Sequence, residues 1–469
     1  MPAMLGSQAG RLGHSVPSEG RLNTPRRKER AMPRNKHKWF AFSRMPNQDF
    51  SVALRFTFAL SLAILILAAP SAAQTVTDIY NFTGNAGDGS EPGVPMIVGA
   101  NGVLYGTTVS GGDLSCGVGG CGTVFQVTPS DGQWTHSTIY EFQGGRDGVD
   151  SYSVLTLDRA GRLYGVTNSG TPYGAIYRLT PGAPGEIRHF HLLYEFKGQS
   201  DGAYSLSPLF LDNSGAIYGA SLQGGLHGKG CNQQFGCGAV FQLVPPAGPG
   251  DVWTENTLYD FRGLADGRNP STMIMDSTGT IYGTTTSGGT FNQNCPSGCG
   301  VVFKLARQNG FWKYSVIHRF KGTPNQIPYG NLVLGPKGVL YGLVRRGFEG
   351  SGGGDIFELT PPVGQTRCWT LQTIHRYPTN TYPATNLTLA ANGVLYGDIY
   401  GDQDFDWGYV FQLVPPAQPE ENWTYTTLVD FNRLGFSQNP DGVVLASGTL
   451  YVTMSGGTYW PGAIVSVVP

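Results

Sequence analysis

The chain has 469 residues, of which 69 are glycine and 31 are proline, with many aromatic and β-branched residues. This composition is typical of short strands joined by tight turns. The formal net charge is −1, but residues 1–73 hold 11 of the 31 basic and 3 of the 32 acidic residues. The rest of the chain keeps 20 basic against 29 acidic residues, which argues against nucleic acid and anionic membrane surfaces as partners.

Residues 1–73 are predicted to be a leader that carries a secretory signal peptide. Residues 56–69 are apolar and uncharged, follow a basic residue and precede the small residues of a cleavage site, which we place after Ala73. The apolar run is short for a transmembrane helix, so no membrane span is expected after cleavage. Met45 would begin a signal of ordinary length, and a start assigned too early explains residues 1–44 better than a functional basic arm. We expect a soluble, monomeric protein exported to the periplasm or the medium.

A tyrosine recurs seven times after the leader, each time three residues after a glycine. The steps between these tyrosines are 59, 54, 64, 59, 55 and 55 residues. Regular self-similarity of this length indicates an array of one supersecondary unit. The tyrosines are Tyr105, Tyr164, Tyr218, Tyr282, Tyr341, Tyr396 and Tyr451.

Each repeat contains four segments that are predicted to be strands, here called A to D in chain order. In the fourth repeat they are residues 271–276, 280–286, 300–305 and 312–320. Apolar residues alternate in the later segments and glycine-containing turns separate them, which is the pattern of antiparallel strands.

Residues 76–82 resemble strand D but precede the first strand A, whereas the seventh repeat stops after its strand C. The N-terminal strand can therefore complete the last repeat and close a ring. We predict an all-β fold for residues 74–469, a seven-bladed β-propeller of four-stranded antiparallel blades. An open β-solenoid is the alternative, but it would not need this permutation.

In a propeller the B–C and D–A loops share one rim, and here the B–C loops vary most in length. Variable loops on a rigid scaffold often carry function, so this rim is the predicted ligand-binding surface for a glycan, peptide or protein. Aromatic residues in rim loops could stack on such a ligand or pack between neighbouring loops. The candidates are Tyr173, Phe291, Phe348, Trp407, Tyr459 and Trp460.

Six of the seven cysteines form three local pairs in equivalent B–C loops. This arrangement predicts loop-closing disulfides, Cys116 with Cys121, Cys231 with Cys237 and Cys295 with Cys299, and leaves Cys368 over. Zinc binding is the weaker alternative, because no second pair stands at zinc-finger spacing.

Two groups of carboxylates could bind cations. Asp-Gly recurs in the D–A connections, with a looser copy at Asp441-Gly442, and the better interpretation is that it makes the turn. Asp402, Asp404 and Asp406 alternate like the start of a calcium loop, but Trp407 stands where such a loop needs glycine. Incidental calcium aside, no cofactor is expected.

No catalytic residue can be nominated, because the chain lacks the spacing of a Ser-His-Asp triad and any phosphate-binding glycine loop. We favour a non-catalytic binding or scaffold protein over the alternative, an extracytoplasmic hydrolase or lyase with its site at the mouth of the central channel. Perturbed acids or bases converging on that mouth would favour the enzyme.

The repeat consensus, seen in residues 104–108 with 122–125 and in 281–285 with 300–303, resembles the GloVer tandem repeat of exported bacterial "choice-of-anchor" proteins. The resemblance covers residues 76–469 and implies export, often with a C-terminal surface anchor, but no assigned activity. The chain ends at a strand C, so soluble export fits better than tethering.

Overall fold

The computed structural model describes residues 75–469 except 118, 150, 169, 182–187, 199–200, 206, 226–230, 232–234, 249, 323–325, 347–352, 365–367, 379–381, 402–407, 419–420, 435–437 and 457–460. The predicted leader lies outside the described residues, so its boundary and the start at Met45 stay predictions. Within the described part of the chain, no helix is long and apolar enough to span a membrane.

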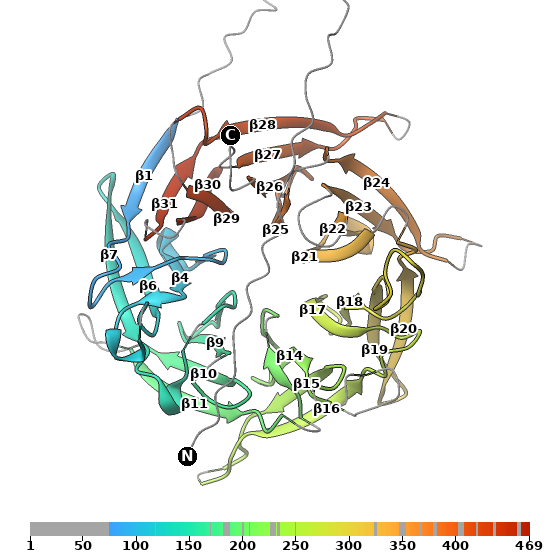
Figure 1. Cartoon of the computed structure of the whole chain (residues 1–469), viewed down its shortest axis with the longest axis horizontal. Helices are drawn as coiled ribbons and strands as arrows, with labels where there is room; N and C mark the ends of the chain where they lie inside the picture. Colours follow the sequence, from blue (N-terminus) through green and yellow to red (C-terminus); the bar gives the residue numbers. More distant parts are fainter. Residues whose placement is uncertain are drawn as a thin grey trace, which may run out of the picture. The chain divides into compact units, whose positions relative to one another are not determined.

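Seven antiparallel sheets form a ring, which confirms the predicted seven-bladed propeller (Figure 1). Blade 1 contains β3 (Ile97–Val98), β4 (Leu104–Thr108), β6 (Thr123–Ser130) and β7 (Gln133–Glu141). Blade 2 contains β8 (Thr156–Leu157), β9 (Leu163–Thr167), β10 (Ala175–Thr180) and β11 (His189–Glu195). Blade 3 contains β12 (Ala203–Ser205), β13 (Phe210–Leu211), β14 (Ile217–Gln223), β15 (Ala239–Val244) and β16 (Thr254–Asp260). Blades 4 and 5 contain β17 (Arg268–Met275), β18 (Ile281–Ser287), β19 (Val301–Gln308) and β20 (Phe311–Arg319); and β21 (Gln326–Leu334), β22 (Leu340–Arg346), β23 (Gly354–Thr360) and β24 (Thr370–Arg376). Blade 6 contains β25 (Tyr382–Leu389), β26 (Leu395–Tyr400), β27 (Tyr409–Val414) and β28 (Thr424–Asp430).

Blade 7 closes the ring with strands from both ends of the described chain. It contains β29 (Gln438–Ala446), β30 (Thr449–Gly456), β31 (Ala463–Val467) and the N-terminal β1 (Val76–Asn81). Strand β1 pairs antiparallel with β31, from Val76 opposite Val467 to Asn81 opposite Ala463. Because a closed ring leaves only short, protected strand edges, this pairing removes the open edge that blade 7 would otherwise have.

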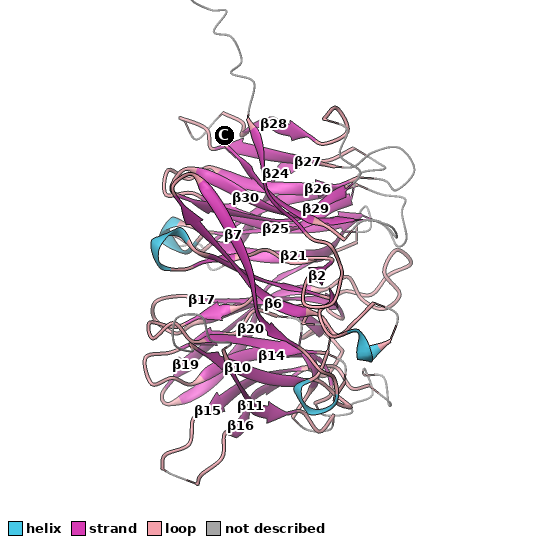
Figure 2. Ribbon diagram, turned by 90° about the vertical axis from the view of Figure 1, so that its left-hand side faces the viewer, coloured by secondary structure: helices cyan, strands magenta, loops and turns pink. Residues whose placement is uncertain are grey.

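Outside the blades, β2 (Gly89–Ser90) and β5 (Ser110–Gly111) form a short ribbon. The described helical elements are single 3-10 turns, η1 (Ala100–Gly102), η2 (Leu114–Cys116), η3 (Gly145–Asp147) and η4 (Pro336–Gly338). Figure 2 shows these turns among strands and loops. Strand pairing and burial between sheets therefore stabilise this fold.

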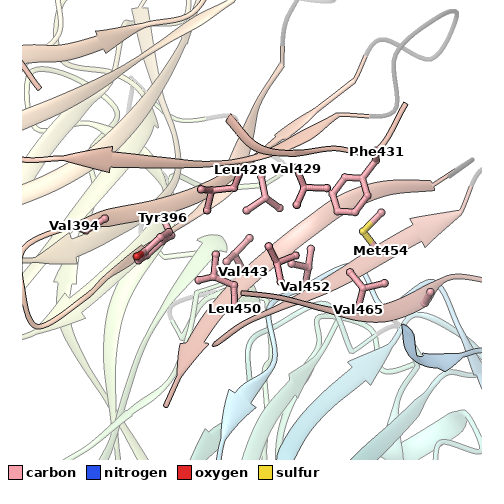
Figure 3. Close-up of a cluster of buried hydrophobic side chains, with 13 residues drawn as sticks. Val394, Tyr396, Leu428, Val429, Phe431, Val443, Leu450, Val452, Met454 and Val465 are labelled. Carbon is pink, nitrogen blue, oxygen red and sulfur yellow. The ribbon is translucent and has the colours of Figure 1, made fainter. Parts of the chain in front are cut away.

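The core lies between neighbouring blades rather than inside any one of them. Between blades 6 and 7, for example, Leu428 and Phe431 from one sheet contact Val443, Val452 and other side chains of the next (Figure 3). The repeated tyrosine belongs to these interfaces, because it makes an edge contact with a tryptophan of the next blade. The pairs are Tyr218 with Trp312, Tyr282 with Trp369, Tyr341 with Trp423 and Tyr451 with Trp134.

Candidate functional site at the inner rim

The innermost strands of four blades bend near a proline. The register shifts after a proline in β17, β21, β25 and β29, and Pro440 to Gly442 is one of these shifts. Such β-bulges re-aim side chains out of the regular ladder. The residue after that proline is Ser271 in blade 4, Tyr329 in blade 5 and Asp441 in blade 7, and Tyr152 lies in the segment before β8 of blade 2.

Side chains from five blades converge at this level. The Tyr152 phenol interacts electrostatically with Asp441, Tyr400, Glu91 and Tyr329, which belong to blades 7, 6, 1 and 5. Burial and these neighbours raise the pKa of Tyr152 to about 12. Only a position near the ring axis can bring residues of so many blades together. We call Glu91, Tyr152, Tyr329, Arg345, Tyr400 and Asp441 the inner rim.

Asp441 is the carboxyl group at the centre of this cluster. It accepts hydrogen bonds from the backbone and side chain of Ser455, while its Oδ2 is buried without a hydrogen-bond partner among described residues. Burial, with a smaller contribution from the charge of Glu91, raises its pKa to about 6. The Asp441 carboxyl therefore changes its protonation state near neutral pH.

Glu91 is held beside Asp441 by contacts between blades 7 and 1. The Glu91 amide donates a 2.7 Å hydrogen bond to the Pro461 carbonyl, and the Thr453 hydroxyl donates one of 3.1 Å to the Val94 carbonyl. A side chain at Gly442 would lie 2.6 Å from Pro95. The two segments that carry these carboxyl groups are thus in direct contact.

Asp398 belongs to strand β26, interacts electrostatically with Asp441 and is only 1% exposed. Neither of its carboxyl oxygens has a hydrogen-bond partner in the described part of the chain. Burial, reinforced by the charge of Asp441, raises its pKa well above the usual value. The scaffold does not require an acid here, because the equivalent residues of the other blades are Thr107, Val166, Ala220, Thr284, Leu343 and Thr453.

The inner rim also holds a stacked cation. The Arg345 guanidinium carbon lies 5.0 Å from the centre of the Tyr329 ring. Tyr400 completes the polar network through hydrogen bonds with Ser455 and Asn439. Aromatic faces, a guanidinium and a titratable carboxyl therefore share one surface, which suits recognition of a polar, ring-containing ligand.

The Asp-Gly carboxylates have a structural role in four connections. In each, the aspartate accepts a hydrogen bond from the strand D tyrosine and from a backbone amide of the same connection, as Asp266 does from Tyr259 and Arg262. The tyrosine pairs are Tyr80 with Asp88 at 3.1 Å, and Tyr140 with Asp147, Tyr194 with Asp201 and Tyr259 with Asp266 at 2.8 Å. The sequence suggested that Asp441 is a looser copy of this turn. Asp441 instead lies within strand β29.

The three predicted disulfides are present. Cys116 is joined to Cys121, Cys231 to Cys237 and Cys295 to Cys299, and Cys368 is free and exposed. Of the predicted rim aromatics, Tyr173 and Phe291 are described, and both are exposed. Phe348, Trp407, Tyr459 and Trp460 fall outside the described residues, as do Asp402, Asp404 and Asp406.

A separate cleft of about 360 Å³ lies at the outside of blade 1, lined by Asp113, Thr138, Tyr140 and Glu141 among others. Its carboxylate Asp113 already accepts a 2.8 Å hydrogen bond from the Ser115 amide. The Tyr140 hydroxyl is likewise engaged by Asp147. The inner rim, which gathers charged and aromatic residues of five blades, is the stronger candidate site.

Sequence reasoning missed most of the inner rim. Arg345 stands at a position where the other repeats carry uncharged residues, and that departure from the repeat is the signal that could have found it. Loop aromatics drew attention instead, because the bulges that turn strand residues toward the axis are not visible in the sequence.

Comparison with known proteins gives a family and a fold. The sequence profile of the Gloeobacter/Verrucomicrobia repeat matches residues 65–232 and 171–411. No curated protein matches the chain. Among solved structures, an ulvan lyase described as a new family of polysaccharide lyase, bound to -[GlcA(1-4)Rha3S]-, is 11% identical, with a TM-score of 0.50 over 84% of this chain and 95% of its own. The extracellular domain of a proposed one component system from B. thetaiotaomicron is 12% identical, with a TM-score of 0.49 over 84% of this chain and 40% of its own.

Proposed function

The chain belongs to the Gloeobacter/Verrucomicrobia repeat family, and we propose that this member is an exported propeller that binds a glycan at its inner rim. The observation that carries the proposal is the convergence of Tyr152, Tyr329 and Asp441, from three blades, at one level of the ring axis. Tyrosine faces stack on sugar rings, and carboxyl groups bond sugar hydroxyls.

The disulfides support the exported part of the proposal, because such bonds persist in oxidising compartments. The fold likeness to a saccharide-bound lyase is compatible with a glycan ligand but carries only the architecture. Tyr173 and Phe291, exposed in B–C loops, are proposed to extend the surface for a longer chain.

Binding of residues 74–469 to a panel of soluble polysaccharides tests the proposal, measured by calorimetry. We expect Tyr152→Ala and Tyr329→Ala each to weaken the best ligand by roughly tenfold or more, about 1.4 kcal/mol. Phe311→Ala is the matched control, because this aromatic is 79% exposed where β20 begins and has no part in the inner rim. Equal losses in all three variants, or no glycan bound at all, would contradict the proposal.

A second function is favoured by one observation, the raised pKa of Asp441 beside Glu91. A protonated carboxyl group next to a second carboxylate is the arrangement used in glycoside hydrolysis, where one acid protonates the leaving oxygen and a carboxylate activates water. Release of reducing ends from the bound glycan, lost in Asp441→Asn with binding retained, would identify an enzyme. Binding without any turnover would identify a binding protein.

A further inference from the structure

Arg345 is a cation that has no anionic partner among the described residues. It is the penultimate residue of β22, and its Nε is buried without a hydrogen-bond partner among described residues. None of the ion pairs found between described residues includes it. A buried donor without a partner is costly, and such a group in a folded protein calls for an explanation.

The neighbouring arginine also has a buried Nε without a hydrogen-bond partner among described residues, but its guanidinium is paired with a carboxylate. Arg346 forms an ion pair with the buried Asp355, and its Nη2 donates a 3.3 Å hydrogen bond to the Gly354 carbonyl. Arg376 approaches the same Asp355 carboxylate at 3.3 Å. The Asp355 carboxylate is therefore shared by two guanidinium groups, those of Arg346 and Arg376.

The repeat shows that the propeller does not need a cation at this position. The equivalent residues at the ends of the other second strands are Val109, Asn168, Leu222, Thr286, Tyr400 and Ser455. Arg345 is the one charged member of this set, and its guanidinium lies over the Tyr329 ring. A guanidinium held in place by an aromatic face presents its N–H groups as a fork that matches oxyanions.

We infer that the glycan of the inner rim is acidic, and that Arg345 binds the carboxylate of a uronic acid or the sulfate ester of a sulfated sugar. This inference rests on the glycan-binding function proposed above and names its ligand class. Tyr152 and Tyr329 would stack on the sugar rings, while Arg345 selects the charged substituent. Both oxyanions offer the same bidentate acceptor, so the experiment must separate them.

Three oligosaccharides of matched length test the inference with residues 74–469: an oligogalacturonate, a sulfated galactan fragment and a neutral galactan fragment. We expect one of the acidic probes to bind at least roughly tenfold tighter than the neutral one, and Arg345→Ala to bring the two within about twofold. Arg345→Lys keeps the charge but not the fork, and should retain only part of the preference. Arg319→Ala, which removes an exposed arginine of β20, should leave the preference unchanged.

The experiment can contradict the acidic ligand without contradicting glycan binding. If a neutral probe binds as tightly as the acidic ones and Tyr152→Ala weakens it, the acidic ligand is wrong and glycan binding stands. If Arg345→Ala, shown by circular dichroism to be folded, keeps the acidic preference, Arg345 is not the selecting residue. If no probe binds to the unaltered protein, both proposals are wrong.

Discussion

Gly342 lies directly opposite Phe357 in the pairing of β22 with β23, and the Phe357 ring occupies the space that a side chain at Gly342 would fill. A Cβ there would be 2.5 Å from the Phe357 Cζ. The same glycine and aromatic pair recurs in the first six blades, as in Gly397 opposite Phe411. In blade 7 both members change together, to Val452 opposite Val465.

Replacing Gly342 with alanine should therefore destabilise the propeller by roughly 1–3 kcal/mol, because the added methyl group overpacks the Phe357 ring. The double variant Gly342→Val with Phe357→Val copies blade 7 and should recover part of that loss. Urea unfolding of both variants measures the free energies. A double variant less stable than the sum of its single changes would contradict this account.

Tyr259 and Asp266 should be energetically coupled. Asp266 accepts hydrogen bonds from the Tyr259 hydroxyl and the Arg262 amide, so Asp266→Ala leaves two donors without their acceptor. We expect a loss of roughly 1–3 kcal/mol in the free energy of unfolding, and a smaller loss for Tyr259→Phe. A double-mutant cycle should give a coupling energy above about 0.5 kcal/mol, and strict additivity would show that the pair contributes nothing.

Asp398 should make the protein less stable as the pH rises. Its pKa in the folded state is well above that in the unfolded state, so the folded state holds the proton more tightly. Stability is then greatest below the unfolded pKa and falls as the pH rises toward the folded pKa, by about 1.4 kcal/mol for each unit between the two values.

Asp398→Thr, which copies the residue of blades 1, 4 and 7, removes this dependence. Unfolding measured at pH 4 and pH 8 should show a steeper loss for the unaltered protein than for the variant, and the variant should be the more stable at pH 8. Parallel pH profiles would mean that Asp398 is not held neutral in the folded state.

Thiol chemistry should report one reactive cysteine. Cys368 is free and exposed, whereas the other six cysteines are in disulfides. Titration of the folded, non-reduced protein with a thiol reagent should modify one group per chain, and Cys368→Ser should remove it.

Because each disulfide closes a short loop, replacing Cys295 and Cys299 by serine should cost about 2 kcal/mol of stability.

Much of the fold was predictable because the same residue spacings recur in every repeat. The seven glycine–tyrosine spacings predicted seven blades, and the displaced copy of strand D at residues 76–82 predicted the closure that β1 makes with β31. The three disulfides were likewise predicted from the short spacing of the cysteines in each pair. The strand D tyrosines and Asp-Gly turns were found as separate patterns, but their hydrogen bonds, such as Tyr259 with Asp266, were not predicted.

The candidate site was not predictable in the same way. Asp441 looked like a turn residue, yet a bulge in β29 places it beside Ser455 and Glu91. Tyr152 and Tyr329 are far apart in the chain and interact only because ring closure brings the segment before β8 near β21.

The sequence by itself thus determined the number of blades, their strand order and the disulfide pairs, because these depend on local periodicity and on spacing along the chain. Only the tertiary structure decided which residues meet at the ring axis. Ring closure brings together residues from five blades, and bulges re-aim side chains of the inner strands, so the electrostatic interaction of Tyr152 with Asp441 has no local signature in the sequence.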